Sequence, residues 1–254
     1  RVYYAGDLTR PGANAELHAV DARIAAKLPA GLDDANAAAL PLTALTAWEA
    51  LFERLGLSPE GKDEGKSVLI VGGAGGVGSL AIQLARQLGK LRVIATASRP
   101  ETVAWVEELG AHAVINHREP LDEALKAVEP RGQVDSILCL NAIDHHWPAM
   151  CNAIAPQGTI CTIVENSGPL DMSQLKLKSA KLAWELMFTR SMFDTEDIAE
   201  QGKILARVAE LVAAGTIKGT LRKTLAPICA ASLREAHALL ESGSMIGKLV
   251  VQGW

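Results

Sequence analysis

Apolar and polar residues follow two different rhythms through the middle of the chain. The run from Ser67 to Val71 is short, apolar and rich in Val and Ile, which is typical of a buried strand in a parallel sheet. Directly after it, apolar residues recur at helical spacing and a glycine closes the pattern: Val77, Leu80, Ala81, Leu84, Leu88 and Gly89. This stretch predicts one strand followed by one amphipathic helix.

The same alternation continues towards the C-terminus. Further strands are predicted over 91–97, 113–116, 134–140 and 159–164, and helices over 100–109, 121–128 and 146–155. Strands that alternate with helices indicate a parallel sheet with helices on both faces. The predicted fold class is therefore α/β, with a doubly wound (Rossmann) sheet whose strand order follows the default for such folds.

The flanking regions have a different pattern. Residues 15–21 alternate like a half-buried strand, and 42–55 have helical spacing. After residue 165 we expect a loop over 166–178, an apolar edge strand over 182–188 and a long amphipathic helix over 194–214. The last elements predicted are a β segment at 220–225, a helix at 232–241 and a strand at 248–252.

Composition narrows the function classes. The chain has 254 residues, 49% of them hydrophobic, with a formal net charge of −4, which gives no general footprint for nucleic acid. No apolar run reaches the length of a membrane span, so we expect no membrane association. Cys139, Cys151, Cys161 and Cys229 are widely spaced and predict small buried residues in a reducing compartment, hence a cytoplasmic protein.

The most informative motif follows the first predicted strand of the sheet. Gly73, Gly75 and Gly78 form G-x-G-x-x-G between a strand and a helix, the context in which this motif binds a dinucleotide. We expect the backbone N–H groups of Gly75, Gly76 and Val77, at the helix N-terminus, to contact the cofactor's pyrophosphate, and Gly73 and Gly78 to complete the cofactor-binding loop. A glycine-rich loop that binds nothing is the alternative.

The end of the next strand indicates which dinucleotide. Counting 20 residues from Gly78 reaches Ser98, where an NAD-selective site places Asp or Glu on the ribose hydroxyls. Ser98 and Arg99 offer a hydroxyl and a guanidinium instead, which favours a 2′-phosphate and therefore NADP. A surface arginine without a role is the alternative. Glu101 follows Pro100 into a helix and is expected to face away.

Several motifs together resemble the medium-chain dehydrogenase/reductase superfamily. They are Pro41-Leu42-Thr43-Ala44-Leu45-Thr46-Ala47-Trp48, the Gly72–Gly78 loop, Leu109-Gly110-Ala111, Ala155-Pro156-Gln157-Gly158, Trp184-Glu185-Leu186-Met187-Phe188 and Gly247-Lys248-Leu249-Val250. Within the superfamily the chain is similar to the quinone-reductase-like, zinc-type alcohol dehydrogenase-like branch. The resemblance implies a partial GroES-like substrate domain at 1–41, a nucleotide domain at 42–216 and a return to the substrate domain at 217–254. The earlier part of the substrate domain would precede Arg1.

The resemblance also assigns residues to parts of the cofactor. It places Asn116 and His117 near the adenosine phosphate, although an exposed loop histidine is an equal alternative for His117. Leu140 and Asn141 should flank the ribose, and Val164 and Glu165 the nicotinamide. Thr43 and Thr46 resemble positions near the nicotinamide, with simple N-capping as the alternative.

Together these observations predict an NADPH-dependent oxidoreductase that transfers hydride to a quinone or conjugated carbonyl. The alternatives are a zinc-free alcohol or aldehyde reductase and a non-catalytic NADPH-binding sensor or structural module. No residue stands out as catalytic and no metal site is predicted, because His145 and His146 are adjacent on a helix and point about 100° apart. We expect a small-molecule substrate, and a homodimer formed through the apolar edge at 182–188.

Overall fold

The computed structural model describes residues 1–28 and 31–254, which divide into two compact units. One unit combines both chain ends, Arg1–Thr46 and Leu186–Trp254, and the other is the continuous segment Ala47–Glu185. The predicted nucleotide domain extends to residue 216, whereas this division groups residues 186–216 with the chain ends. The helix α2 (Pro41–Trp48) contains the first boundary.

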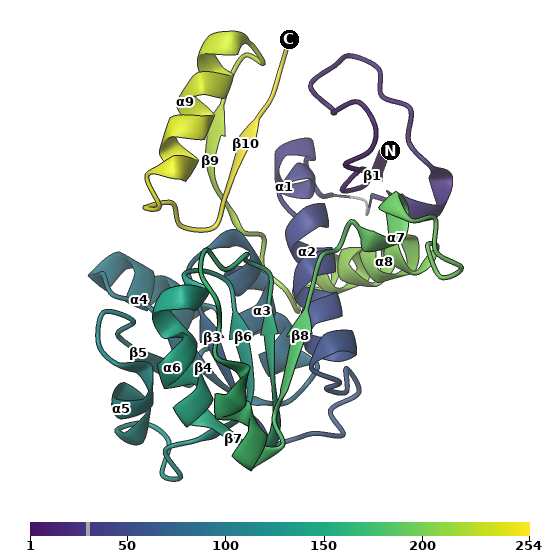
Figure 1. The fold of residues 1–254 in the computed structure, drawn as a ribbon. Helices are drawn as coiled ribbons and strands as arrows, with labels where there is room; N and C mark the ends of the chain where they lie inside the picture. Colours follow the sequence, from purple (N-terminus) through teal and green to yellow (C-terminus); the bar gives the residue numbers. More distant parts are fainter. Residues whose placement is uncertain (29–30) are drawn as a thin grey trace. The chain divides into compact units, whose positions relative to one another are not determined.

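The continuous unit is built on a parallel sheet. Among the described residues this sheet has six strands in the order β5-β4-β3-β6-β7-β8, the order of a doubly wound fold (Figure 1). The strands are β3 (Ser67–Val71), β4 (Arg92–Thr96), β5 (Ala113–Ile115), β6 (Val134–Cys139), β7 (Ile154–Thr162) and β8 (Lys181–Trp184). The register places Ile70 opposite Ala95 on one side and Leu138 on the other. The predicted fold class and strand alternation are confirmed.

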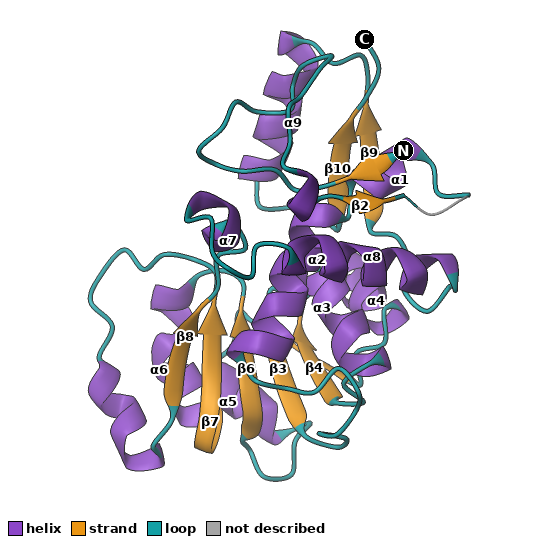
Figure 2. Ribbon diagram, turned by 90° about the vertical axis from the view of Figure 1, so that its right-hand side faces the viewer, coloured by secondary structure: helices purple, strands orange, loops and turns teal. Residues whose placement is uncertain are grey.

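Helices connect successive strands of this sheet. They are α3 (Gly76–Gln87), α4 (Pro100–Glu108), α5 (Leu121–Lys126), α6 (Ile143–Ala153) and the 3-10 helix η3 (Met172–Lys178), with the π-helix η2 (Glu49–Arg54) preceding the sheet. Figure 2 shows the strand arrows side by side with their tips at a common edge. The segment 166–178 is predicted as a loop, but in the structure its second half forms the helix η3.

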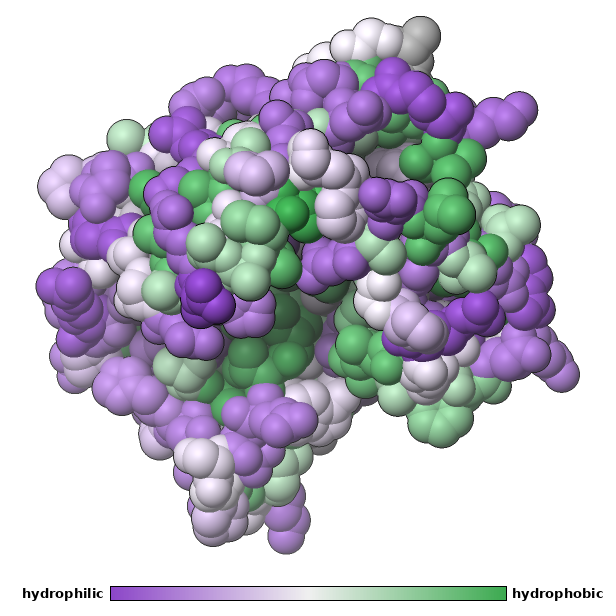
Figure 3. All heavy atoms as spheres, turned by 90° about the horizontal axis from the view of Figure 1, so that it is seen from above, coloured by the Kyte–Doolittle hydropathy of each residue, from purple (hydrophilic) through white to green (hydrophobic). Residues whose placement is uncertain are grey.

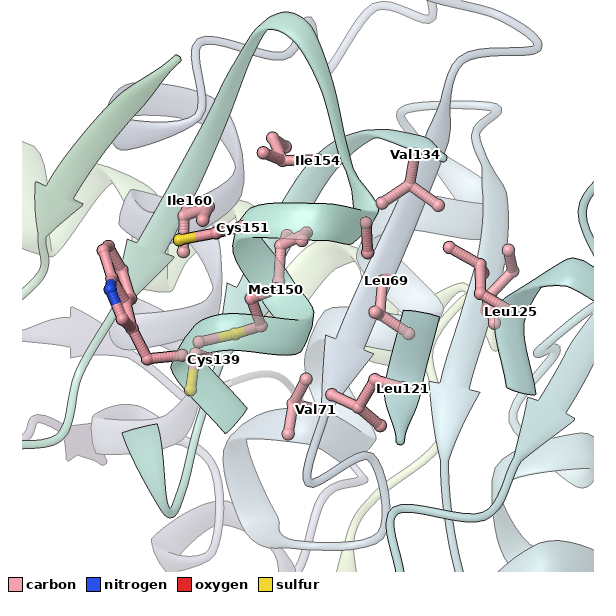
Figure 4. Close-up of a cluster of buried hydrophobic side chains, with 14 of the residues drawn as sticks. Leu69, Val71, Leu121, Leu125, Val134, Cys139, Met150, Cys151, Ile154 and Ile160 are labelled. Atoms are coloured by element: carbon pink, nitrogen blue, oxygen red, sulfur yellow. The ribbon is translucent and has the colours of Figure 1, made fainter. Parts of the chain in front are cut away.

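The core on one face of the sheet is continuous. Leu69 and Val71 of β3 pack with residues of α5 and α6, including Leu121, Leu125 and Met150 (Figure 4). All five are fully buried. Because the alternate β3 residues Val68 and Ile70 are also fully buried, both faces of the strand are covered, as its unbroken apolar run predicts.

The unit formed by the chain ends contains shorter strands. β1 (Val2–Tyr3) pairs antiparallel with β2 (Ala26–Lys27), and β9 (Leu221–Leu225) pairs parallel with β10 (Lys248–Val251). The helices are η1 (Ala22–Ile24), α1 (Asp34–Ala38), α7 (Thr189–Met192), α8 (Glu200–Ala213) and α9 (Ala230–Glu241). The Tyr3 hydroxyl donates to Leu205 O at 2.6 Å and so ties β1 to α8.

Two predicted elements of this unit are wrong. Residues 15–21 form no strand, and Leu17 within them is 92% exposed. The long helix begins at Glu200 rather than at residue 194, because Asp194 has a positive φ of 45° that a helix does not allow. Instead, Asp197 pairs with Arg190 and Asp194 with Arg23.

The surface carries scattered apolar residues. Leu177 and Phe193 are 96% and 72% exposed, and on the face shown in Figure 3 apolar patches lie between hydrophilic ones. Every helix within the described residues is too short or too polar to cross a bilayer. Cys139, Cys151 and Cys161 are buried as predicted, whereas Cys229 is exposed at the start of α9.

Candidate functional site

The carboxyl edge of the parallel sheet collects nearly all of the predicted cofactor residues. Because the strands run in one direction, the residues that directly follow them lie along a single edge. These residues are Gly73, Gly75, Gly76, Val77 and Gly78 after β3, Ser98 and Arg99 after β4, Asn116 and His117 after β5, Leu140 and Asn141 after β6, and Val164 and Glu165 after β7. The structure thus brings together in one unit positions that span 93 residues of sequence.

The turn after β3 is held by the neighbouring strand. Gly72 adopts a φ of +88°, which only glycine enters without strain, and its N–H donates to Thr96 Oγ1 at 2.9 Å. The next N–H, of Gly73, donates to Thr96 O at 3.3 Å. Thr96 at the end of β4 therefore fixes where the glycine-rich loop leaves the sheet.

The glycines of the loop have different roles. A Cβ on Gly78 would lie 2.5 Å from Gly72 O, and one on Gly73 would lie 2.9 Å from Ala95 Cβ, so both positions need glycine for packing. A Cβ on Gly75 would meet nothing nearer among the described residues than Gly72 O at 3.6 Å. The space beside Gly75 is therefore left open by the protein, as a close approach of a ligand to the backbone requires.

Backbone donors converge on that space. The first helical hydrogen bond of α3 runs from Ser79 N to Gly75 O at 2.9 Å, so the N–H groups of Gly76, Val77 and Gly78 precede the helical ladder. Gly75, Gly76 and Val77 are half-buried. The N-terminus of this 12-residue helix has the donors and the dipole that bind a phosphate.

A side chain of the helix supports its own first turn. Ser79 Oγ donates to Gly75 O at 2.7 Å and accepts a hydrogen bond from Trp105 Nε1 of α4 at 2.9 Å. Ser79 is fully buried. Sequence analysis did not identify this support, because Ser79 and Trp105 are separated by 26 residues and meet only once the sheet has formed.

The residues after β4 are arranged differently from the prediction. Arg99 Nε donates to Glu101 Oε1 at 2.9 Å, so Glu101 faces Arg99 and the expectation that it faces away is wrong. The reason is local: Arg99 is the N-cap of α4, and Glu101 lies in its first turn. The Glu101 side chain is 58% exposed, and an exposed ion pair of this kind is worth at most about 1 kcal/mol.

His117 lies half-buried after β5. Burial lowers the pKa of His117, and the positive charges of Arg118 and Arg99 lower it further. Its Nδ1 is buried and has no hydrogen-bond partner among the described residues. The imidazole is therefore neutral at pH 7, with a ring nitrogen that an incoming ligand could satisfy. Its neighbour Asn116 instead accepts from Arg118 N at 3.1 Å.

The ends of β6 and β7 complete the edge. A Cβ on Gly72 would lie 3.4 Å from Leu140 Cβ and 3.6 Å from Asn141 Oδ1, so both residues border the glycine-rich loop. Val164 N donates to Thr162 Oγ1 at 3.3 Å, and Glu165 is exposed. Ile163 N donates to Cys139 O at 3.3 Å, so the ends of these two strands are adjacent.

The threonines of α2 do not cap the helix. Thr46 Oγ1 donates to Leu42 O at 2.8 Å and Thr43 Oγ1 to Leu40 O at 3.1 Å, so both hydroxyls bond back to carbonyls within the chain. The N-capping alternative is therefore wrong. Thr46 belongs to the unit of the chain ends, and its assignment to the nicotinamide remains a prediction.

One of the two adjacent histidines is exposed and the other is buried. Their ring centroids are 4.7 Å apart at the beginning of α6, with His145 exposed and His146 5% exposed. Burial lowers the pKa of His146 to about 4, with smaller effects from His145 and His117. In the part of the chain that the structure describes, no three His, Cys, Asp or Glu side chains are grouped to hold a metal ion.

Comparison with known proteins identifies the family to which this chain belongs. The family model for zinc-binding dehydrogenases matches residues 109–251. A zinc-type alcohol dehydrogenase-like protein of Staphylococcus epidermidis is 41% identical over 251 residues, which cover 98% of this chain and 74% of the relative. The chain belongs to the zinc-binding dehydrogenase family. It is therefore an oxidoreductase of the medium-chain dehydrogenase/reductase superfamily, and the predicted resemblance is confirmed.

Solved structures of the family agree with this fold. A Rhizobium etli protein described as a zinc-dependent alcohol dehydrogenase matches with a TM-score of 0.93 and 48% identity, over all of this chain and 73% of that one. The quinone oxidoreductase of Escherichia coli, solved with NADPH, matches with a TM-score of 0.80 and 25% identity, over 99% of this chain and 74% of that one.

Proposed function

We propose that this dehydrogenase uses NADPH to reduce a quinone or a conjugated carbonyl compound. The observation that carries the proposal is the carboxyl edge of the sheet, where the open space beside Gly75 meets the N-terminus of α3 and Arg99 follows the next strand. Helix donors suit the pyrophosphate, and a guanidinium suits a 2′-phosphate. The E. coli quinone oxidoreductase complex with NADPH supports the choice of cofactor and of substrate class.

The residues of this chain bind and orient the cofactor rather than react with it. When bound, NADPH supplies the hydride. The N–H groups of Gly76 and Val77 would hold the pyrophosphate, and Arg99 with Ser98 the 2′-phosphate. Leu140 and Asn141 would flank the ribose, and Val164 and Glu165 the nicotinamide. No residue is proposed as the proton donor.

Two alternatives share this cofactor site. A zinc-free alcohol or aldehyde reductase would use the same loop with another substrate, and a redox sensor would bind NADPH without turnover. We further propose a cytoplasmic homodimer, paired through the edge strand β8, where Trp184 is 49% exposed. Met187, which the sequence placed on the same apolar edge, is 2% exposed and belongs to the interior.

The test combines binding and turnover. NADPH and NADH are titrated against the protein by calorimetry, and NADPH oxidation is then followed with a panel of quinones, enones and simple aldehydes. Tighter binding of NADPH with quinone or enone turnover supports the proposal. Aldehyde turnover alone favours the alcohol dehydrogenase-like reductase, and binding without any turnover favours the sensor. Equal or tighter binding of NADH contradicts the NADPH assignment.

A further inference from the structure

Asp144 accepts hydrogen bonds from three donors of a neighbouring loop. It lies in the first turn of α6, and both of its carboxylate oxygens face the segment that follows β7. Ser167 N donates to Oδ2 at 2.9 Å and to Oδ1 at 3.1 Å, and Ser167 Oγ donates to Oδ2 at 3.1 Å. Gly168 N donates to Oδ1 at 3.1 Å. One carboxylate thus holds two consecutive backbone N–H groups and a hydroxyl.

The middle of this loop depends on that carboxylate. Val164 and Leu170 pack against the apolar core of the sheet on either side of residues 165–169. Within the loop, Asn166 Nδ2 donates to Gly168 O at 2.8 Å. Among the described residues, no hydrogen bond other than those to Asp144 joins 165–169 to the rest of the protein. A single side chain therefore anchors the loop between its two apolar ends.

The turn between β6 and α6 places Asp144 beside the loop. Ala142 has a left-handed φ of +48°, and its carbonyl O accepts from the N–H groups of His145 and His146 at 3.1 Å, so the helix begins directly after this turn. The ends of β6 and β7 are adjacent, since Ile163 N donates to Cys139 O. A left-handed conformation is unfavourable for alanine, and residues of this kind are concentrated at functional sites.

The charge of Asp144 suits its partners. Hydrogen bonds from the backbone N–H groups of Ser167 and Gly168 lower the pKa of Asp144, and the Ser167 hydroxyl lowers it further. The side chain is therefore an ionised carboxylate at neutral pH, which only accepts hydrogen bonds, and all of these partners donate. Hydrogen bonds to an ionised acceptor are stronger than neutral ones. An amide at this position would turn its NH₂ group towards donors.

We propose that Asp144 is a positioning residue of the cofactor site, which holds the loop after β7 and, through it, Val164 and Glu165 beside the nicotinamide. This inference rests on the proposed function, which assigns the nicotinamide to these two residues. All of the groups involved belong to the unit Ala47–Glu185. A loop that is already in place loses little further conformational entropy when the cofactor binds, and this preorganisation strengthens binding.

Amide hydrogen exchange tests the anchor without any ligand. Asp144→Ala should speed exchange about tenfold at Ser167 and Gly168, the two amides that lose their acceptor. The matched control is Asp171→Ala, because Asp171 makes the same kind of contact at the start of η3, where it accepts from Ser173 N at 3.0 Å and Ser173 Oγ at 2.6 Å. The control should leave Ser167 and Gly168 unchanged. Unchanged exchange at these amides in Asp144→Ala would overturn the proposal.

Calorimetric titration with three ligands tests the role in binding. Asp144→Ala should weaken NADPH and NADH alike, by about tenfold, because both carry the nicotinamide. Adenosine 2′,5′-bisphosphate has the adenosine and the 2′-phosphate but no nicotinamide, and its affinity should not fall. A general loss of structure would weaken all three ligands. Removal of a negative charge favours the binding of anions, so weaker NADPH binding cannot result from the change in charge.

The variants separate this role from the proposed function. Asp144→Asn keeps one oxygen acceptor and should show the same pattern with a smaller loss, so it replaces Asp144→Ala if that variant does not fold. Asp171→Ala should bind all three ligands like the wild type. Full NADPH affinity in Asp144→Ala, or equal losses for NADPH and the bisphosphate, would overturn the role of Asp144 while the NADPH site stands. Wild-type protein that binds none of the ligands would reject the proposed function and this role with it.

Discussion

Trp105 Nε1 donates a hydrogen bond to Ser79 Oγ at 2.9 Å, and through this contact α4 supports the first turn of α3. Ser79 Oγ in turn donates to Gly75 O, the carbonyl that accepts the first helical bond. The turn that we propose as the phosphate site is therefore supported by its neighbouring helix before any ligand binds, and preorganisation of this kind lowers the cost of binding.

Removing the Ser79 hydroxyl should loosen this turn. Ser79→Ala deletes the acceptor of the indole N–H and the donor to Gly75 O in a fully buried site, which should lower the free energy of unfolding by about 1–3 kcal/mol. Urea unfolding measures this loss. NADPH affinity, titrated at a temperature where the variant is folded, should fall as well. Unchanged stability would show that the two hydrogen bonds contribute nothing.

Substitutions at two glycines of the loop should affect NADPH affinity and folding stability separately. Gly75→Ser places a good N-capping side chain in the open space, so the protein should fold with unchanged or slightly higher stability while NADPH affinity falls. Gly78→Ala is the contrasting variant, because its Cβ would lie 2.5 Å from a backbone oxygen and should cost about 3 kcal/mol of folding free energy. Gly75→Ser with full NADPH affinity would argue against the pyrophosphate site.

Arg99 should determine the preference for NADPH. A charge-assisted hydrogen bond to phosphate is worth about 1.5–3 kcal/mol, so Arg99→Ala should weaken NADPH about tenfold or more and leave NADH nearly unchanged. Glu101→Gln removes the carboxylate that competes for the guanidinium and should tighten NADPH but not NADH. Calorimetric titration of both cofactors checks both variants. Equal losses for the two cofactors would reject the 2′-phosphate assignment.

His146 should make the fold sensitive to acid. Its pKa is about 4 in the folded protein and near 6.5 when unfolded, so the unfolded chain binds the extra proton in this interval. Stability should fall by about 2 kcal/mol between pH 7 and pH 4.5, a loss that His146→Asn removes. The exposed His145→Asn variant serves as the control and should keep the wild-type dependence in urea unfolding.

The proposed dimer can be tested at the edge strand. Trp184→Glu adds a charge to an exposed position of β8 and should shift sedimentation from dimer to monomer at micromolar concentration. Leu177→Glu makes the same kind of change at a residue that is 96% exposed on η3, and should leave the dimer intact. A wild-type protein that sediments as a monomer would contradict the proposal.

Local patterns were sufficient for the parallel sheet. Strands such as Ser67–Val71 are buried on both faces, so their apolar runs have one structural interpretation. The glycines that follow this strand predict the turn between it and α3. The edge of the sheet where we predict the cofactor residues follows from this alternation. The strand predicted at residues 15–21 was wrong because apolar and polar residues can alternate by chance in a surface segment that pairs with no other strand.

Contacts between distant residues could not be predicted. Arg54 and Glu185 are separated by 131 positions, and Glu185 looks like an ordinary surface glutamate until folding buries it and brings its carboxylate within 2.8 Å of Arg54 Nε. The ion pair of Glu101 with Arg99 is local, but its direction depends on where α4 begins, and helix ends are the least certain part of any pattern.

The position of Arg99 has a consequence for how this enzyme could evolve. The backbone of Arg99 starts the next helix: its N–H donates to Thr102 Oγ1 at 3.1 Å, and its carbonyl O accepts from the same hydroxyl at 2.8 Å. Its side chain, in contrast, is 32% exposed and pairs with Glu101. Exchanging that side chain leaves the helix start intact, and substitutions of this kind usually change stability by about 0.5 kcal/mol or less. On the proposed assignment of Arg99 to the 2′-phosphate, single mutations that the fold tolerates would redirect the enzyme from one nicotinamide pool to another, and closely related chains need not draw on the same pool.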